Sequence, residues 1–353
     1  MDRRSFLKLA AAFAATAACD TSRPTPTASG SAAPSATGGA TRKLSLYAAL
    51  DEATATEIVN AFGKARADVI VTLLPVASGS ELATRIRVER AAPKADAFTG
   101  GPSAFHALLG SEGLLEPYVS PSASAIDARY KDPAGLWTGC YTTLFGFAAN
   151  TGRLRAELGG RMPATWDDLL DPSWKGKLVI PDPKRSDEGY LFVATQFFRL
   201  GRDDTATLDY LRKLHANAPQ YPSLTADALA LVARAGAAGG PSWSHDAIAA
   251  KRKGSPIDVA IPSGATAEVG AVSILRSAKD LAAARAFVDW MLSREAEELV
   301  VRASARGPTR GDVAPADTPS YAQAQLVDYD WRFAADGRTR IIGLWERAIG
   351  ERT

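Results

Sequence analysis

The sequence is poor in the residues from which disulfide networks, metal sites and nucleophilic active sites are built. Its 353 residues include two cysteines, Cys19 and Cys140, and three histidines. With Cys19 modified no intrachain disulfide is possible, and a lone Cys140 beside a tyrosine is typical of a small buried side chain. The histidines lack paired metal-ligand spacing, and no Gly-x-Ser-x-Gly or Walker sequence occurs. These absences disfavour an enzyme, so we expect no catalytic residue, no metal site and no cofactor.

Strong net charge and long apolar runs are also missing. The 41 basic and 39 acidic residues leave a net charge of +2, so no nucleic-acid partner is expected. The apolar run at residues 9–18 is shorter than the roughly 20 residues that a transmembrane helix needs. The sequence is otherwise 46% hydrophobic and 23% charged, as in soluble globular proteins.

The N-terminus has the pattern of an export signal. Arg3-Arg4 precedes the apolar run, which predicts a twin-arginine signal peptide over residues 1–18. Small residues directly before Cys19 resemble a lipobox, although Thr16 stands where leucine is usual. We therefore expect Cys19 to be lipidated and the protein to be exported, anchored to the membrane by lipid at the cell surface or in the periplasm. The alternative is an incidental thiol near an ordinary cleavage site.

The following segment, residues 19–41, is rich in Ser, Thr, Pro, Ala and Gly. It cannot bury enough apolar surface to offset its ordering entropy, so we predict a disordered tether. The body after it, about 310 residues, suits two lobes rather than one ordinary domain.

The body alternates between strand and helix patterns, which predicts an α/β protein whose lobes are mainly parallel sheets flanked by helices. In the first part we expect strands at 43–50, 69–74 and 95–99, and helices at 52–65, from 80, and from Gly101-Pro102. After residue 150 we expect a strand at 178–180 and helices at 166–170, 189–200, 205–215, 226–235 and 245–253.

Several strand-to-helix junctions combine a hydroxyl with glycine or a basic residue. Unpaired amides and the positive end of a helix dipole at such junctions suit a phosphate, phosphonate or carboxylate. A serine before a helix is most often only a cap, so the recurrence in both halves is what indicates a small anionic ligand. The junction residues predicted to bind it are Ser78, Gly79, Ser80, Gly101, Ser103, Arg185, Ser186, Ser244 and His245.

The chain resembles the type II periplasmic binding proteins of the family 1 extracellular solute-binding class. Within that class it is similar to the subgroup of ferric-iron, sugar-phosphate and 2-aminoethylphosphonate binders. The stretches that carry the resemblance are ASGSEL (77–82), EGLLEPY (112–118), PATWDDLLDPSWKGK (163–177), WSHDA (243–247) and AFVDWMLS (286–293).

The resemblance implies two lobes that are joined by two crossing strands and close over a solute. Lobe 1 would comprise residues 42–140 and 269–310, and lobe 2 residues 141–268 and 311–353. It also implies a monomer that delivers its solute to the permease of an ABC importer and catalyses nothing.

Departures from these relatives bear on the ligand. Ferric-iron binders have adjacent tyrosines where this chain has WSHD (243–246), and no such pair exists here, so ferric iron is the alternative ligand. On the expected return crossing, Thr266 and Glu268 are further candidates. Glu268 would repel a phosphate but attract an amine, which favours a zwitterion such as an aminophosphonate; an N-cap or an ion pair between lobes is an equal alternative. Ser244-His245-Asp246 is contiguous, so it does not have the geometry of a catalytic triad, and an exported hydrolase is the distant alternative.

Overall fold

The computed structural model describes residues 41–76 and 78–350, which belong to a compact body comprising Ala40–Thr353. The predicted signal peptide, Cys19 and nearly all of the tether lie outside the described residues. No helix in the described part is long and apolar enough to cross a membrane.

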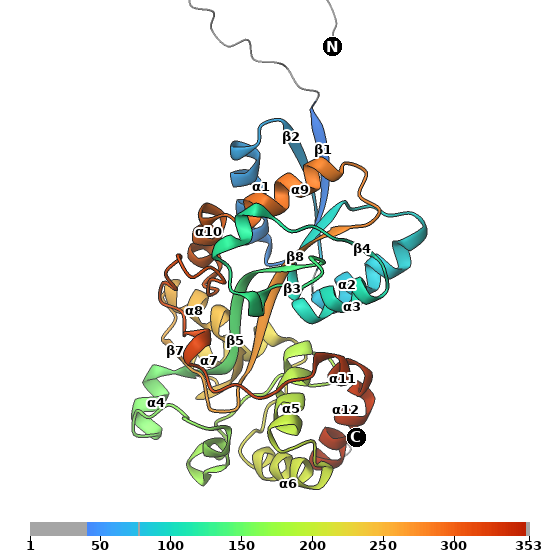
Figure 1. The fold of residues 1–353 in the computed structure, drawn as a ribbon. Coiled ribbons are helices and arrows are strands. Elements are labelled where there is room, and N and C mark those ends of the chain that lie inside the picture. Colours follow the sequence, from blue (N-terminus) through green and yellow to red (C-terminus); the bar gives the residue numbers. More distant parts are fainter. Residues whose placement is uncertain (1–40, 77, 351–353) are drawn as a thin grey trace, which may run out of the picture. The chain divides into compact units, whose positions relative to one another are not determined.

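Eight strands of the described chain form one mixed sheet (Figure 1). The order is β2-β1-β3-β8-β5-β6, while β4 pairs with β8 and β7 with β5. Only β1 with β2 and β1 with β3 are parallel among these pairings, so the sheet is less parallel than we predicted. The strands are β1 (Arg42–Ala49), β2 (Val69–Pro75), β3 (Ala97–Pro102), β4 (Leu115–Glu116), β5 (Thr138–Asn150), β6 (Gly239–Trp243), β7 (Ile257–Ala260) and β8 (Thr266–Leu275).

Helices flank the two ends of this sheet in two groups. With β1–β4 lie α1 (Glu52–Ala65), α2 (Gly79–Val88), α3 (Ser103–Ser111), α9 (Leu281–Met291) and α10 (Arg294–Ser304). With β6 and β7 lie α4 (Thr151–Glu157), α5 (Asp187–Arg199), α6 (Asp204–His215), α7 (Thr225–Ala233), α8 (Ser244–Arg252), α11 (Trp331–Asp336) and α12 (Arg338–Ile349). Short 3-10 helices cover Glu89–Ala91, Pro121–Ala125, Ala128–Tyr130, Trp166–Leu170, Pro172–Trp174 and Tyr321–Gln323.

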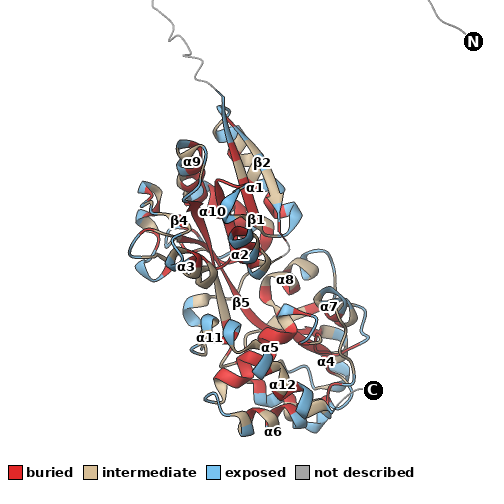
Figure 2. Cartoon of the chain, turned by 90° about the vertical axis from the view of Figure 1, so that its right-hand side faces the viewer, coloured by how far each residue is buried: buried red, intermediate tan, exposed pale blue. Residues whose placement is uncertain are grey.

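Separate hydrophobic cores make this a two-lobed fold. In the first lobe, Phe62 of α1 packs edge-on against Phe287 of α9, with ring centroids 5.3 Å apart. In the second, Trp166 packs against Phe192 of α5 at 5.4 Å. The long strand β5 enters both cores and runs as a buried strand between the two groups of helices (Figure 2).

The two crossing strands are β5 and β8, which pair antiparallel from Thr138↔Val272 to Phe145↔Thr266. The expected crossings near residues 141–149 and 268–274 fall within these strands. After α10 the chain stays beside the first lobe, where Tyr321 packs against Tyr130, before α11 and α12 join the second core. The division at residues 140, 268 and 310 stays a prediction.

Two of the predicted secondary-structure elements differ from those in the structure. Gly101 and Pro102 end β3 instead of opening a helix, and α3 begins at Ser103. The residues at 178–180 form isolated parallel bridges, Leu178↔Gly239 and Val179↔Gln220, rather than a strand. At residues 178–180, a run of three apolar residues is too short for its periodicity to distinguish a strand from isolated bridges.

Cys140 and His106 are buried core residues. Burial raises the pKa of Cys140 to about 12, so its thiol stays protonated and is a poor nucleophile. His106 bonds to Ser273 and Gly100, and burial lowers its pKa to about 4, which keeps the imidazole neutral. Both side chains therefore act in packing.

Candidate functional site

The start of α2 lies against the end of β3. Ser78 caps α2 by accepting a hydrogen bond from the Glu81 amide at 3.2 Å, and its hydroxyl is 2.9 Å from that of Ser80. A Cβ atom on Gly101 would lie 2.8 Å from the Cα of Gly79, so these two backbones touch and exclude any side chain there. The structure thus brings Ser78, Gly79, Ser80 and Gly101 together.

Tyr141 connects this corner to the second crossing strand. The Gly101 amide donates to the Tyr141 hydroxyl at 3.1 Å, and that hydroxyl donates to Glu268 Oε1 at 3.0 Å. The Gly101 amide that we expected at the anion is therefore already occupied in this structure. Burial raises the pKa of Tyr141 well above its usual range, so the phenol remains a neutral donor.

His245, at the start of α8, has both ring nitrogens engaged. Its Nε2 is 2.9 Å from the Arg306 guanidinium, which can only donate, so Nε2 is the acceptor. Nδ1 then carries the proton and donates to the Thr143 hydroxyl at 2.7 Å. Burial, followed by the charge of Arg306, holds the pKa of His245 well below its usual value. His245 is thus a neutral imidazole with a defined tautomer.

Ser244 is not paired with His245. Its hydroxyl accepts from the Leu144 amide at 3.4 Å and lies 3.4 Å from the Thr143 hydroxyl, and the side chain is buried. A nucleophilic serine needs a base within hydrogen-bond reach, and here that base bonds to Arg306 instead. Ser244-His245-Asp246 therefore does not form a catalytic unit.

Arg306 is the candidate site residue that sequence reasoning missed. It follows α10, is 7% exposed, and contacts Asp51 Oδ2 at 3.3 Å as well as His245. Its guanidinium lies over the Tyr141 ring at 5.0 Å, and its Nε is buried without a hydrogen-bond partner. No motif marks an arginine after a helix as functional; only its contacts identify it.

We call the polar residues around this arginine the crossing cluster. They come from the start of α1, both crossing strands, the start of α8 and the segment after α10. Its members are Asp51, Tyr141, Thr143, His245, Asp246, Glu268 and Arg306.

Carboxylates are prominent in and beside the crossing cluster. Burial raises the pKa values of Asp246 and Glu268, against the lowering effect of Arg306. Burial also raises the pKa of Glu188 on α5, and the charges of Asp246 and Asp187 raise it further, which places these acidic groups near one another. Glu188 Oε2 is buried without a partner. The site therefore contains more carboxyl groups than its one arginine can pair with, and burial favours their protonated forms.

Asp51, the N-cap of α1, differs from these acids. Burial opposes its ionisation, but hydrogen bonds from Thr54 and the charge of Arg306 hold the pKa of its carboxyl below the usual value. It is the charged partner of Arg306.

The second lobe reaches the start of α2 through Asp187, the first residue of α5. The Ser80 hydroxyl donates to Asp187 Oδ2 at 3.3 Å, so the starts of α2 and α5 face each other across the two lobes. Asp187 also pairs with Arg338 at 3.2 Å.

Three of the four other predicted site residues have structural partners. Ser186 caps α5 through the Gly189 amide and bonds to Thr225 at 2.7 Å. Arg185 is exposed and bonds to Ser223 at 3.3 Å. Thr266 is fully buried against Thr195 at 2.7 Å, and Ser103 is a partly exposed residue in the first turn of α3. Among the described residues, none of these four side chains hydrogen-bonds to the crossing cluster, and their role in binding stays a prediction.

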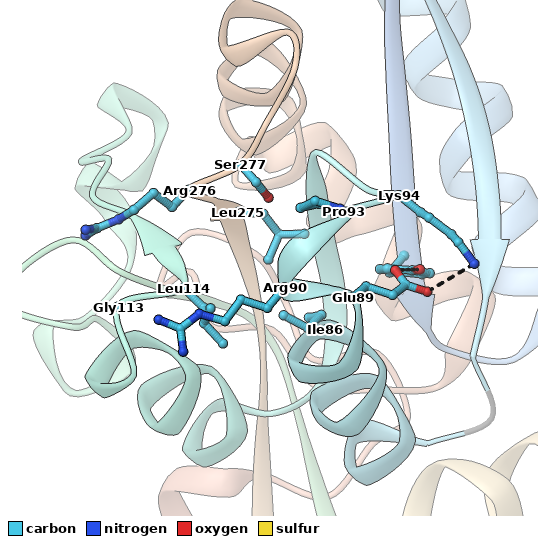
Figure 3. Close-up of a pocket in the computed structure, with 11 residues that line it drawn as sticks. Ile86, Glu89, Arg90, Pro93, Lys94, Gly113, Leu114, Leu275, Arg276 and Ser277 are labelled. Carbon is cyan, nitrogen blue, oxygen red and sulfur yellow. Dashed lines mark hydrogen bonds and ion pairs between the residues drawn. The ribbon is translucent and has the colours of Figure 1, made fainter.

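A separate pocket of about 380 Å³ lies in the first lobe, near the 3-10 helix Glu89–Ala91 (Figure 3). Ile86, Leu114 and Leu275 supply its apolar lining. Its lining includes no member of the crossing cluster and none of the predicted ligand residues, so the two sites are distinct.

Comparison with known proteins identifies the family. Residues 92–336 match the model for the bacterial extracellular solute-binding proteins. An uncharacterized protein of Haemophilus influenzae is 31% identical over 326 residues, which cover 89% of this chain and 93% of that protein. The chain belongs to the bacterial extracellular solute-binding proteins.

Two other relatives of this solute-binding protein are described by ligand. A putative 2-aminoethylphosphonate-binding periplasmic protein of Salmonella typhi is 27% identical over 281 residues, covering 76% of this chain and 80% of that protein. The structure of the periplasmic binding protein AfuA from Actinobacillus pleuropneumoniae, with exogenous fructose-6-phosphate bound, matches with a TM-score of 0.72 and 31% identity. That match covers 87% of this chain and 98% of AfuA.

The predicted family, two-lobed fold and general function are therefore confirmed. This is an exported solute-binding component of an ABC-type importer, which captures a small solute and delivers it to a permease, and it is not an enzyme.

Proposed function

We propose that the solute has an anionic group together with a part rich in hydrogen-bond donors, and that it binds between the lobes at the crossing cluster. The observation that carries this proposal is the composition of the cluster. Arg306 and the helix starts favour an anion, whereas Asp246, Glu268 and the nearby Glu188 favour hydroxyl or ammonium groups.

The charge balance argues against a solute that is only an anion. A phosphate or dicarboxylate would be repelled at short range by each of these carboxyl groups that is ionised, and would raise their pKa values further. A sugar phosphate offers hydroxyl donors to these acids, and an aminophosphonate offers an ammonium group. The named ligands of the two relatives, fructose-6-phosphate and 2-aminoethylphosphonate, belong to these two classes.

We assign the residues of the site to the two parts of the solute. Ser80, exposed at the start of α2, and Arg306 are proposed to hold the anion, with hydroxyls and helix-start amides around them. Asp246 and Glu268 are proposed to bind the donor-bearing part. Ferric iron is the alternative solute; the sequence has no adjacent tyrosine pair for it, and the described residues contain no group of three His, Cys, Asp or Glu side chains arranged to hold a metal ion.

Matched ligand pairs test this division. We expect 2-aminoethylphosphonate or fructose-6-phosphate to bind at least about tenfold more tightly than ethylphosphonate or inorganic phosphate, because the latter lack the donors. Thermal-shift titration measures this, since a ligand at about a hundred times its Kd adds about 2.7 kcal/mol of stability. Glu268→Gln should reduce the advantage of the ammonium compound. Equal affinity for ethylphosphonate and its amino derivative, or for inorganic phosphate and the sugar phosphate, would contradict the division.

We also propose that the protein is a monomeric lipoprotein anchored through Cys19. Several acyl chains on one residue would hold an exported protein firmly at the membrane. Cys19→Ser should move the protein from the membrane fraction to the soluble fraction and abolish incorporation of labelled palmitate. Cys140→Ala is the control, because Cys140 is buried and should leave both readouts unchanged. Persistent labelling of the Cys19→Ser variant would show that another site is acylated.

A further inference from the structure

The segment that carries Arg306 has little regular structure of its own. α10 ends at Ser304, and Ala305 adopts the left-handed conformation with φ of 56°. Gly307 then exchanges two backbone hydrogen bonds with Thr142 of β5, each 2.7 Å long. The direction in which Arg306 enters the crossing cluster therefore depends on what else holds residues 305–310.

Glu297 of α10 holds this segment from the interior of the first lobe. Its side chain is fully buried, and its Oε2 accepts from the backbone amides of Thr309 and Arg310, both at 3.0 Å. Its Oε1 is hydrogen-bonded to the Thr309 hydroxyl. All of these bonds join Glu297 to the segment that carries Arg306.

The Thr309 hydroxyl lies between two oxygen atoms. Its Oγ1 is 3.0 Å from the Gly139 carbonyl oxygen of β5 and is also bonded to Glu297 Oε1. If Glu297 is ionised, the Thr309 hydroxyl donates to it and must share its one hydrogen with the Gly139 carbonyl oxygen. If Glu297 is protonated, it can donate to Thr309, which leaves the hydroxyl hydrogen for Gly139 and satisfies both bonds.

The electrostatic surroundings of Glu297 also favour its protonated form. Burial raises the pKa of Glu297 to about 7, although the bonds from Thr309 and Arg310 and the charge of Arg310 lower it. The other titratable groups coupled to it are Tyr130 and Cys140, whose pKa values are themselves raised, so both are neutral at neutral pH. The carboxyl thus changes its charge near neutral pH instead of near its ordinary 4.5.

We infer that Glu297 is a positioning residue for the solute site, and that its protonated form holds residues 305–310 against β5 and so directs Arg306 into the crossing cluster. This inference rests on the proposed role of Arg306 in binding. Because the folded protein holds this proton more tightly than the unfolded chain does, the contribution of Glu297 to folding stability falls as pH rises from about 4.5 to about 7. Loss of the proton strengthens the two amide bonds to Glu297 but leaves a desolvated carboxylate inside the first lobe, the larger of the two effects. Opening of the segment would hydrate that carboxylate, so the segment loosens above neutral pH.

Hydrogen exchange of the empty protein tests the positioning directly. We expect the amides of Gly307, Thr309 and Arg310, corrected for intrinsic rates, to lose about tenfold in protection between about pH 6 and about pH 8. Glu297→Gln should keep them protected at both pH values, because the Gln amide donates to Thr309 as the protonated acid does. Glu297→Ala should expose them at both. Glu298→Gln, at the next and exposed position of α10, is the matched control and should behave as the unsubstituted protein.

Affinity for 2-aminoethylphosphonate and fructose-6-phosphate, measured at the same pH values, should follow the same pattern. Glu297→Ala should weaken binding about tenfold, and Glu297→Gln should remove the pH step. A pH step that persists in Glu297→Gln, or affinity that is unchanged in Glu297→Ala, would overturn the inference. If neither probe binds the unsubstituted protein, the proposed solute class is contradicted. The role of Glu297 is then decided by hydrogen exchange, which needs no ligand.

Discussion

Arg306→Ala is expected to weaken solute binding by more than about a hundredfold, the largest effect on binding that we predict. Losing a charged donor to a desolvated anion costs about 1.5–3 kcal/mol for each hydrogen bond, and an arginine can make two such bonds to one anion. Here the substitution would remove the solute's proposed anion partner and the donor to His245 Nε2, while Asp51, whose side chain is 52% exposed, can be hydrated. Isothermal titration with the tighter of the two probes measures the loss.

Arg302→Ala is the matched control for this prediction. Arg302 lies four residues earlier, on α10, and makes an exposed ion pair with Glu57 at 3.2 Å. Exposed pairs contribute about 0–1 kcal/mol, so binding should change little. If Arg306→Ala bound the probe within about threefold of the unsubstituted protein, the crossing cluster would not be the solute site.

Gly270→Ala is expected to cause the largest loss of stability. A Cβ atom at position 270 would lie 1.8 Å from Cζ of Tyr141, which is closer than any non-bonded contact allows. Tyr141 is itself buried and bonded to Gly101 and Glu268, so it cannot move without breaking those bonds. Overpacking of this severity should reduce the free energy of unfolding by about 3 kcal/mol or more, measured by urea denaturation.

Gly63→Ala provides the matched comparison. Gly63 lies within α1, and an added Cβ there meets nothing within 4 Å. The same substitution should therefore stabilise the protein by about 0.5–1 kcal/mol through helix propensity. A second check is the Gly270→Ala, Tyr141→Ala double variant, whose loss should be smaller than the sum of the single losses, because the clash is absent. Additive losses would mean that the ring at position 141 is not the obstacle.

Gly270 and Arg306 both lie where the lobes meet, but we expect their substitutions to change different properties of the protein. Gly270 allows the Tyr141 ring to lie across the paired crossing strands, and its replacement should primarily affect folding. Arg306 contacts the second lobe through His245 and should primarily affect the population of the closed, solute-bound state. Comparing melting temperature and affinity in the same samples separates these effects.

The local elements were predictable because their causes are local. Asp51 precedes the apolar spacing of α1 and caps it, and Ser78 and Ser186 cap α2 and α5. The region WSHD (243–246) was recognised as important, and His245 and Asp246 do lie in the crossing cluster. The roles of individual donors were less predictable: Gly101 donates to Tyr141, and Thr266 bonds to Thr195 within the second lobe.

By itself the sequence determined the α/β class, the two-lobed family fold and the helix starts, since apolar periodicity and capping act over a few residues and the family stretches extend across the body. Only the tertiary structure decided which polar groups remain available to a solute. Arg306 reaches its site because Gly307 pairs with Thr142 and Glu297 holds Thr309, contacts between residues that are up to 165 positions apart. Such long-range pairings leave no local pattern, and the same geometry that brings the acids together also shifts their pKa values by burial.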